Sequence, residues 1–228
     1  MRPRDLVTGL ADLVLGARCP GCGRPAPAAC EQCVAGVVAV RPVPVPGLPS
    51  GLPPVLAGGW YDGELRQLVL AAKEREALGV VGLLGGRVAA AVAAWLLATG
   101  HGGPVVLVPV PSSRAGVAAR GLDLPWALAG VAATRLRATG AAASRWRGLR
   151  LVRAPRDQSE LGRGERLANL AGALRGVARP PDGVPVVVDD IVTTGATLAE
   201  AIRAGSVAGW VPGAAAVVAA TPLRGGAR

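Results

Sequence analysis

The strongest constraint on the fold is a segment late in the chain, Pro185-Val-Val-Val-Asp189-Asp190-Ile-Val-Thr193-Thr194-Gly195-Ala-Thr197-Leu. Its run of valines predicts a buried strand, and the spacing of apolar residues over 197–208 predicts a helix. A strand that passes through a short turn into a helix is the repeating unit of an α/β sheet. We therefore expect an α/β domain with two adjacent carboxylates at the end of one of its buried strands.

The polar residues of this turn predict a phosphate site. Threonine hydroxyls and backbone N–H groups at a helix N-terminus suit a phosphate monoester. Two adjacent carboxylates can accept hydrogen bonds from the vicinal hydroxyls of a ribose. The expected ribose 5-phosphate site consists of Asp189, Asp190, Thr193, Thr194, Gly195, Ala196 and Thr197. The segment lacks the G-K-[ST] of a Walker loop. Capping of the turn and helix alone would need one aspartate and one threonine, not the whole string.

The four cysteines form two C-x-x-C pairs, Cys19 with Cys22 and Cys30 with Cys33. Tetrahedral zinc takes four thiolates at about 2.3 Å, and each C-x-x-C turn presents two of them from one short loop. Disulfides are the main alternative, and the cytoplasmic setting that we expect disfavours them. A redox C-x-x-C is the other alternative, although paired knuckles are unusual for one. The pattern predicts a structural zinc site with no open coordination position.

At 228 residues, 51% of them hydrophobic, the chain is long enough for one sizeable α/β domain and a small appendage. We predict an N-terminal helix and four-cysteine zinc module over 1–36, a Pro- and Gly-rich linker or extended wrap over 37–59, and the α/β domain over 60–228. Alternating helix and strand patterns in that domain indicate a parallel sheet flanked by helices. The expected helices are 64–77, 87–97, 123–137 and 197–208, and the expected strands are 105–108, 149–153, 173–177, 184–188 and 214–220.

The formal net charge of +10 favours anionic partners, namely phosphates, nucleic acid or an acidic surface. Residues 135–179 hold 11 arginines against three acidic residues, which fits a basic binding face and an ordinary solvated face alike. The apolar stretch 78–98 has Arg87 at its centre, which costs about 2.5–3.5 kcal/mol in a membrane. We therefore expect a buried helix there, no membrane span, and a soluble cytoplasmic protein.

The order strand, Asp-Asp, Thr-Thr-Gly, helix is similar to the phosphoribosyl pyrophosphate (PRPP) signature of type I phosphoribosyltransferases. Further motifs resemble the ComF family within that fold, over nearly the whole chain and in the family's order. They are the cysteine pairs, Tyr61-Asp-Gly63 leading to Lys73, Val108-Pro109-Val110-Pro111 followed by Ser112-Ser113-Arg114, Arg120-Gly121, and the series Arg153, Gln158, Arg166 and Asn169.

The resemblance implies a type I phosphoribosyltransferase fold that binds PRPP with Mg²⁺ and transfers phosphoribose to an acceptor, nucleobase-like by analogy with the fold. Residues 112–120 would be the loop that faces the pyrophosphate, and 153–166 the mobile loop that closes over the reaction centre. The residues implied in catalysis are Lys73, Arg114, Arg120, Arg153 and Arg166. The chain departs from the family pattern at Asp123, Leu124 and Pro155, where asparagine, glutamine and threonine are usual.

Two other functions stay open beside a Mg²⁺-dependent phosphoribosyltransferase. ComF relatives are associated with DNA uptake during competence, so one alternative is a protein that binds single-stranded DNA through the basic run 135–179. Trp146, between Arg145 and Arg147, is the aromatic residue that we would test for a base contact. The other alternative is a regulator that binds PRPP without consuming it.

Overall fold

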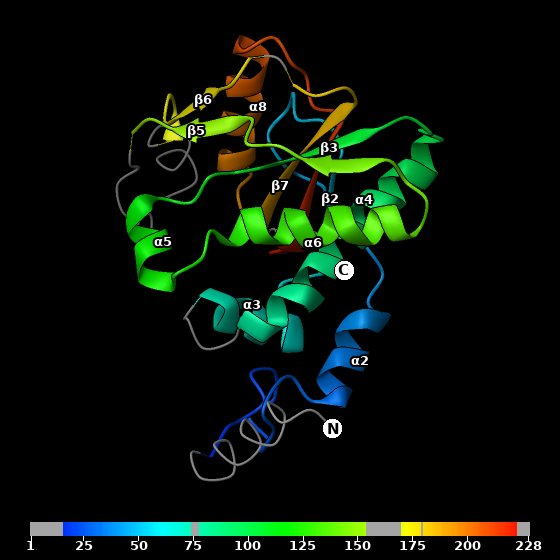
Figure 1. Cartoon of the computed structure of the whole chain (residues 1–228), viewed down its shortest axis with the longest axis vertical. Coiled ribbons are helices and arrows are strands. Elements are labelled where there is room, and N and C mark those ends of the chain that lie inside the picture. Colours follow the sequence, from blue (N-terminus) through cyan, green and yellow to red (C-terminus); the bar gives the residue numbers. More distant parts are fainter. Residues whose placement is uncertain (1–15, 74–77, 154–169, 179, 223–228) are drawn as a thin grey trace.

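The computed structural model describes residues 16–73, 78–153, 170–178 and 180–222 and shows an α/β fold (Figure 1). Its centre is a six-stranded sheet in the order β1-β2-β8-β7-β3-β4. β1 is antiparallel to β2, and the remaining neighbours in the sheet are parallel, which confirms the predicted class. The strands are β1 (Val43–Pro44), β2 (Val55–Ala57), β3 (Val105–Pro109), β4 (Ala143–Arg145), β7 (Val184–Val192) and β8 (Ala214–Ala220).

Both faces of the sheet are covered, as is usual for parallel strands. Along β3, Val105 and Leu107 pack on one face, and Val106 and Val108 on the other. Three helices cover the first face, and a helix with a two-stranded antiparallel ribbon covers the second (Figure 1). The first group is α3 (Gly63–Lys73), α4 (Val81–Thr99) and α6 (Leu124–Ala138), and the second is α8 (Ala196–Val207) with β5 (Leu149–Leu151) and β6 (Leu174–Gly176).

Three short elements complete the described part of the chain. The 3-10 turn η1 (Leu78–Val80) leads into α4, and α5 (Arg114–Arg120) follows β3. The helix α2 (Glu31–Ala39) begins directly after Cys30. Figure 1 shows α2 and the cysteine segment at the lower end of the molecule, with α3 between them and the sheet.

Within the described ranges, α4 is the one helix long and apolar enough to cross a membrane, with a mean hydropathy of 1.8. It packs against α6 and β8 and buries Leu84, Val88 and Val92 in the main core. Its arginine, Arg87, is also buried. The predicted buried helix is therefore confirmed, and α4 has the place of a core helix in this domain.

Arg87 fastens the N-terminal segment to this core. Its side chain is 5% exposed and donates hydrogen bonds to the backbone oxygens of Gly58, Val38 and Val40. Burial lowers the pKa of Arg87, while the carbonyl acceptors replace part of the lost hydration of the guanidinium. Because Val38 and Val40 lie at the C-terminal end of α2, the positive charge also faces the negative end of that helix dipole.

Two segments contain elements that the sequence did not predict. Residues 37–59, predicted as a linker or an extended wrap, supply the end of α2 and both β1 and β2, and β2 pairs with β8 in the main sheet. Strands of two and three residues are too short to leave a periodic pattern. Residues 112–120, predicted as a loop, contain the helix α5, because Ser113 caps it by accepting a hydrogen bond from the Gly116 N–H at 3.0 Å. Residues 1–15 of the predicted N-terminal helix lie outside the described residues.

Candidate phosphate-binding site and metal centre

Two adjacent carboxylates lie in the C-terminal half of β7, in the middle of the sheet, and two more strand residues, Ile191 and Val192, follow them. Asp189 is 8% exposed and accepts a hydrogen bond from the backbone N–H of Asp190 at 2.8 Å. Asp190 accepts one from the N–H of Ile191 at 2.7 Å. Burial, together with the nearby charge of Asp190, raises the pKa of Asp189 to about 8, because both disfavour the ionised form. This shift favours the protonated form of Asp189, which can donate a hydrogen bond.

Lys73, the only lysine of the chain, lies beside these carboxylates. Its Nζ is 2.9 Å from Oδ2 of Asp190, and the two side chains are 36% and 18% exposed. Lys73 is the last residue of α3, and the helix presents buried side chains such as Leu68 to the core. The structure thus places one residue that the resemblance implied in catalysis directly on the predicted ribose-binding pair.

The turn after β7 has a backbone conformation that favours glycine. Gly195, the N-cap of α8, has φ 78°. A Cβ at this position would lie 2.9 Å from Cδ of Pro49 and 3.1 Å from Cδ2 of Leu48, so the backbone of the turn fits closely under that segment. The hydroxyl of Thr194 accepts a hydrogen bond from the Ala196 N–H at 3.4 Å.

Ala196 and Thr197 are the first residues of α8, which is 12 residues long, and Thr193 is exposed before it. The positive end of this helix dipole therefore follows the aspartate pair after the last two residues of β7 and the turn 193–195. Carboxylates, hydroxyls and a helix N-terminus thus lie along one short segment of the chain, from the C-terminal half of the central strand to the first turn of α8. This arrangement can hold a phosphorylated sugar.

The chain after β3 leaves the sheet near the same place. In the register of the two strands, Pro109 of β3 pairs with Val188, one residue before Asp189. Ser112 then donates a hydrogen bond to Oδ1 of Asp123 at 3.2 Å, and Arg147 lies 3.5 Å from Oδ2 of the same carboxylate. Asp123, one of the departures from the family pattern, thus ties the segment before α5 to the connection between β4 and β5.

The arginines implied in catalysis have different surroundings. Arg114 is exposed at the start of α5, and Arg120 ends that helix, with its Nε buried and unpartnered within the described part of the chain. Arg153 lies beside the β5–β6 ribbon, where its guanidinium donates to the backbone oxygen of Ala171 at 3.1 Å. In the described ranges no ion pair joins Arg114 or Arg120 to either aspartate. Arg166 and most of the predicted mobile loop lie outside the described residues.

The four cysteines form a cluster whose sulfurs all lie within 4.8 Å of one another. The sulfurs of Cys22 and Cys30 are 3.7 Å apart. Four sulfurs about 2.3 Å from a zinc ion form a tetrahedron with edges of about 3.8 Å, so the donor set fits a metal such as zinc. Cys19 and Cys33 are 2% exposed, which places the cluster against the rest of the protein.

The backbone around Cys19 favours a thiolate. N–H groups of Gly21 and Cys30 donate to its sulfur at 3.4 and 3.3 Å. Although burial acts in the opposite direction, these N–H groups and that of Cys22 lower the pKa of Cys19 to about 6. Burial raises the pKa of Cys33, and a bound cation would reverse this by binding the deprotonated form.

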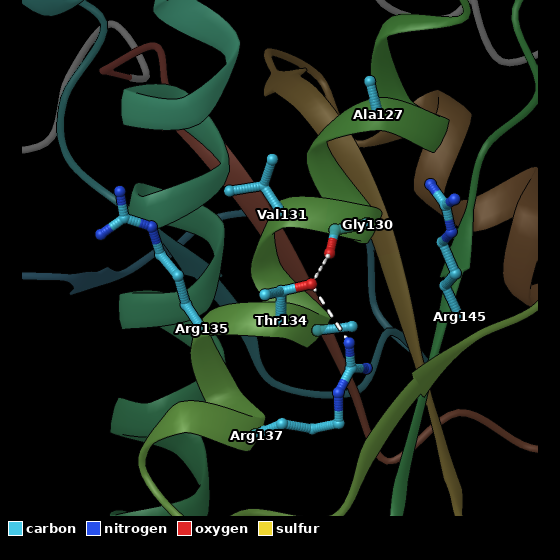
Figure 2. A pocket seen from close by; sticks show the side chains of 8 residues that line it. Ala127, Gly130, Val131, Thr134, Arg135, Arg137 and Arg145 are labelled. Carbon is cyan, nitrogen blue, oxygen red and sulfur yellow. Dashed lines mark hydrogen bonds between the residues drawn. The ribbon is translucent and has the colours of Figure 1, made fainter.

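A shallow basic groove of about 530 Å³ lies on the outer side of α6 (Figure 2). Arg137 donates to the Ala143 oxygen at 2.8 Å, and Arg145 donates to the Trp126 oxygen at 3.0 Å. Figure 2 shows the guanidinium groups spread around the helix and not converging on one point. The groove has no acidic lining residue and shares none with the aspartate–threonine site; it is lined by Ala127, Gly130, Val131, Ala133, Thr134, Arg135, Arg137 and Arg145.

The tryptophans near this groove are already packed. Trp146 is partly buried against the core, with its ring 5.8 Å from that of Trp210 in an edge-on arrangement. The guanidinium groups of Arg145 and Arg147 lie 4.1 and 4.0 Å from the ring centre of Trp126. The structure therefore does not favour Trp146 as a base-stacking residue.

Sequence reasoning missed the segment that lies against the turn 193–195. Leu48, Pro49 and Leu52 surround the position that a Cβ of Gly195 would take. The available signal was the Pro and Gly content of residues 37–59, which predicts extended chain but does not show what the chain covers.

No protein-family model matches the chain, and no curated protein matches it. The residues themselves and their geometry are therefore the basis for assigning a function.

Proposed function

We propose that the chain is a ComF-like protein with a type I phosphoribosyltransferase fold, which binds PRPP with Mg²⁺ and transfers phosphoribose to a nucleobase-like acceptor. The observation that carries the proposal is the aspartate pair in the C-terminal half of β7, which is followed by the last two strand residues, the threonine turn and α8. Ligands of α/β sheets bind beyond the carboxyl ends of the strands. The contact of Lys73 with Asp190 adds a cation to this same place.

Each part of the site has a role in this proposal. The N–H groups at the start of α8 and the threonine hydroxyls bind the 5-phosphate. Asp189 and Asp190 bind the two ribose hydroxyls. When Asp189 is protonated, it donates a hydrogen bond to one hydroxyl, and the carboxylate of Asp190 accepts one from the other. Mg²⁺ prefers carboxylate and phosphate oxygens and would neutralise charge on the pyrophosphate. Zinc on the four cysteines would hold the fold and take no part in the reaction.

Transfer breaks the bond between C1′ and the pyrophosphate oxygen, which leaves with the electron pair. A nitrogen of the acceptor forms the new bond to C1′, and its proton passes to water. Positive charge develops at C1′ and negative charge on the leaving group, so cations that face the pyrophosphate lower the barrier. We assign this role to Lys73, Arg114 and Arg120.

The test is a calorimetric titration of PRPP into the zinc-loaded protein with and without Mg²⁺, with pyrophosphate measured in the same samples across a panel of bases and amines. We expect Mg²⁺-dependent binding that Asp189→Asn/Asp190→Asn abolishes. The matched control, Asp62→Asn/Asp182→Asn, removes two exposed carboxylates and should bind as the wild type does. A folded wild type that fails to bind PRPP would overturn the proposal. Binding without pyrophosphate release with any acceptor would identify a PRPP sensor.

The groove on α6 favours a second function, contact with single-stranded DNA. Its rim of arginines offers donors to phosphates, while none of its lining residues is aromatic, so binding there would depend on charge and not on stacking. Arg135→Gln/Arg137→Gln/Arg145→Gln should weaken binding of oligo-dT and reduce the salt slope by about 2, since each phosphate contact on a single strand contributes about 0.7. The control is Arg150→Gln/Arg175→Gln on the exposed ribbon. An affinity that does not depend on salt would contradict this function.

A further inference from the structure

The cysteine cluster is in direct contact with α3, the helix that ends at Lys73. A Cβ on Gly21, inside the first knuckle, would lie 2.8 Å from Sγ of Cys33 and 3.6 Å from Cδ2 of Leu68. Leu68 belongs to α3 and is fully buried. The knuckle backbone therefore fits between one of the thiols and the buried face of the helix, with no space for a larger residue.

Further contacts join the same two parts. Val37 of α2, one turn after Cys33, is 1% exposed and packs in one cluster with Leu65 and Leu68, and Ala29 packs against this cluster. A Cβ on Gly59 would lie 2.8 Å from Cγ1 of Val40 and 3.0 Å from Cδ2 of Leu65. The cysteine module, residues 16–40, thus holds α3 along one side over a full turn.

The other end of this helix reaches the aspartate pair. Five residues separate Leu68 from Lys73, a rise of about 7.5 Å along a helix. The ammonium of Lys73 is 2.9 Å from Asp190, so a small rotation or shift of α3 is enough to open the ion pair. Packed cores transmit such shifts because they are dense and yield little locally.

We propose that the four-cysteine module is a positioning element for Lys73. With metal bound, the module holds α3 so that Lys73 neutralises Asp190. When the metal is lost, no ligand joins the two C-x-x-C loops. The module then no longer holds α3 in place, and the ion pair opens. Metal occupancy at one end of the molecule then sets the charge that a ligand meets at the aspartate pair. The proposal concerns the ligand-free protein and does not depend on phosphoribosyl transfer.

Lys73 can be followed by itself, because it is the only lysine of the chain. We would measure the rate at which N-hydroxysuccinimidyl acetate acetylates Lys73 in the full-length protein, with peptide mass spectrometry separating Lys73 from the terminal amine. The zinc-loaded protein, the chelator-treated protein and the protein with zinc restored are compared. Zinc removal should raise the rate about twofold to fivefold, the range expected when a partly exposed ion pair opens, and added zinc should reverse the increase.

Three variants separate positioning from general loosening. Leu68→Ala should raise the rate even with zinc bound. Asp190→Asn should raise the acetylation rate of Lys73 by the same factor, and zinc removal should then have no further effect on this rate. Leu136→Ala deletes an equally buried leucine of the same core, on α6, and should leave the rate unchanged. Circular dichroism confirms that each sample is folded; if Leu68→Ala is not, the zinc comparison decides.

An unchanged Lys73 rate in the folded, zinc-free protein would overturn the proposal. So would an equal increase in Leu136→Ala, or a zinc effect that persists in Asp190→Asn, because both would show general loosening of the domain and not a shift of α3.

Discussion

The two motifs that stand out in the sequence are supported in different ways. The aspartate pair and its turn follow β7, which lies between β3 and β8 in the sheet and is covered on both faces. The first cysteine knuckle is held by local hydrogen bonds, such as those from Cys19 N to the Arg24 oxygen at 2.7 Å and from Gly23 N to the Cys19 oxygen at 2.8 Å. Most residues around it are exposed or half-buried.

The two sites obtain their stability from different sources. Hydrophobic burial and sheet hydrogen bonds fix the backbone of the aspartate site before any ligand arrives. The core of the cysteine module is too small to fix its backbone in this way, so the module depends on a metal and on its contacts with α3 and Arg87. The backbones of the two regions should therefore respond separately to a perturbation, although α3 joins the module to the Lys73–Asp190 ion pair.

Removal of the metal should have the largest effect, confined mainly to the module. Structural zinc contributes about 10–16 kcal/mol of apparent binding energy to small zinc domains, so chelation or Cys22→Ser/Cys30→Ser should unfold the cysteine module, residues 16–40, while the sheet persists. Hydrogen exchange read by peptide should show fast exchange in the module and strong protection in β7 and β8. Equal loss of protection in both regions would contradict the separation.

Arg87→Met should destabilise the junction between the two regions. The substitution keeps the apolar stem but removes the donors to Gly58, Val38 and Val40. Unsatisfied carbonyls that had bonded to a charged group should cost about 1.5–3 kcal/mol of the free energy of unfolding. Urea unfolding measures this loss, and Arg135→Met, at an exposed residue of α6, is the control. A cost as small as that of the control would mean that water satisfies these carbonyls.

Gly195→Ala should disturb the phosphate turn without unfolding the sheet. A left-handed residue with a Cβ costs about 1–2 kcal/mol, and this Cβ would also press on Pro49 and Leu48. The matched control is Gly209→Ala, where φ is 87° but nothing lies within 4 Å of the added Cβ. Both variants should lose similar backbone stability in thermal unfolding, whereas Gly195→Ala alone should weaken PRPP binding. Equal PRPP affinity in the two variants would show that the turn adjusts freely.

The sequence predicted the parts that are local and missed those that depend on tertiary contacts. The valine run, the aspartate pair and the threonine turn follow one another along the chain, so strand and helix patterns were enough to place them. The cysteine spacing likewise predicts a cluster without knowledge of the fold. In the sequence, Arg87 served only as an argument against a membrane span. Its hydrogen-bond acceptors lie more than 25 residues away along the chain, so the sequence did not indicate them.

The properties of the aspartate pair also needed the fold. Nothing near Asp190 in the sequence indicates an ion pair with Lys73, which arrives from a separate helix; only the family resemblance drew attention to that lysine. The short strands β1 and β2 were missed because pairing with β8, and not local propensity, makes them strands. The raised pKa of Asp189 depends on its burial in the sheet, which the sequence does not express.

Asp189→Asn should change how stability depends on pH, with the smallest effect of the four. The pKa of Asp189 is about 8 in the folded protein and about 3.9 in an unfolded chain. Between these values the folded state binds the additional proton, so this group makes the free energy of unfolding fall as pH rises. Asparagine keeps the shape without titrating.

The variant should therefore gain stability relative to the wild type as pH rises from 7 to 8, by at most about 1.4 kcal/mol over that unit. Urea unfolding at both pH values measures the difference, with Asp182→Asn at an exposed site as the control that should show none. Parallel pH dependences for Asp189→Asn and the wild type would mean that Asp189 is ionised at neutral pH. The C-terminal half of β7 would then carry two negative charges beside Lys73. Its need for a bound cation would then be closer to that of the cysteine module.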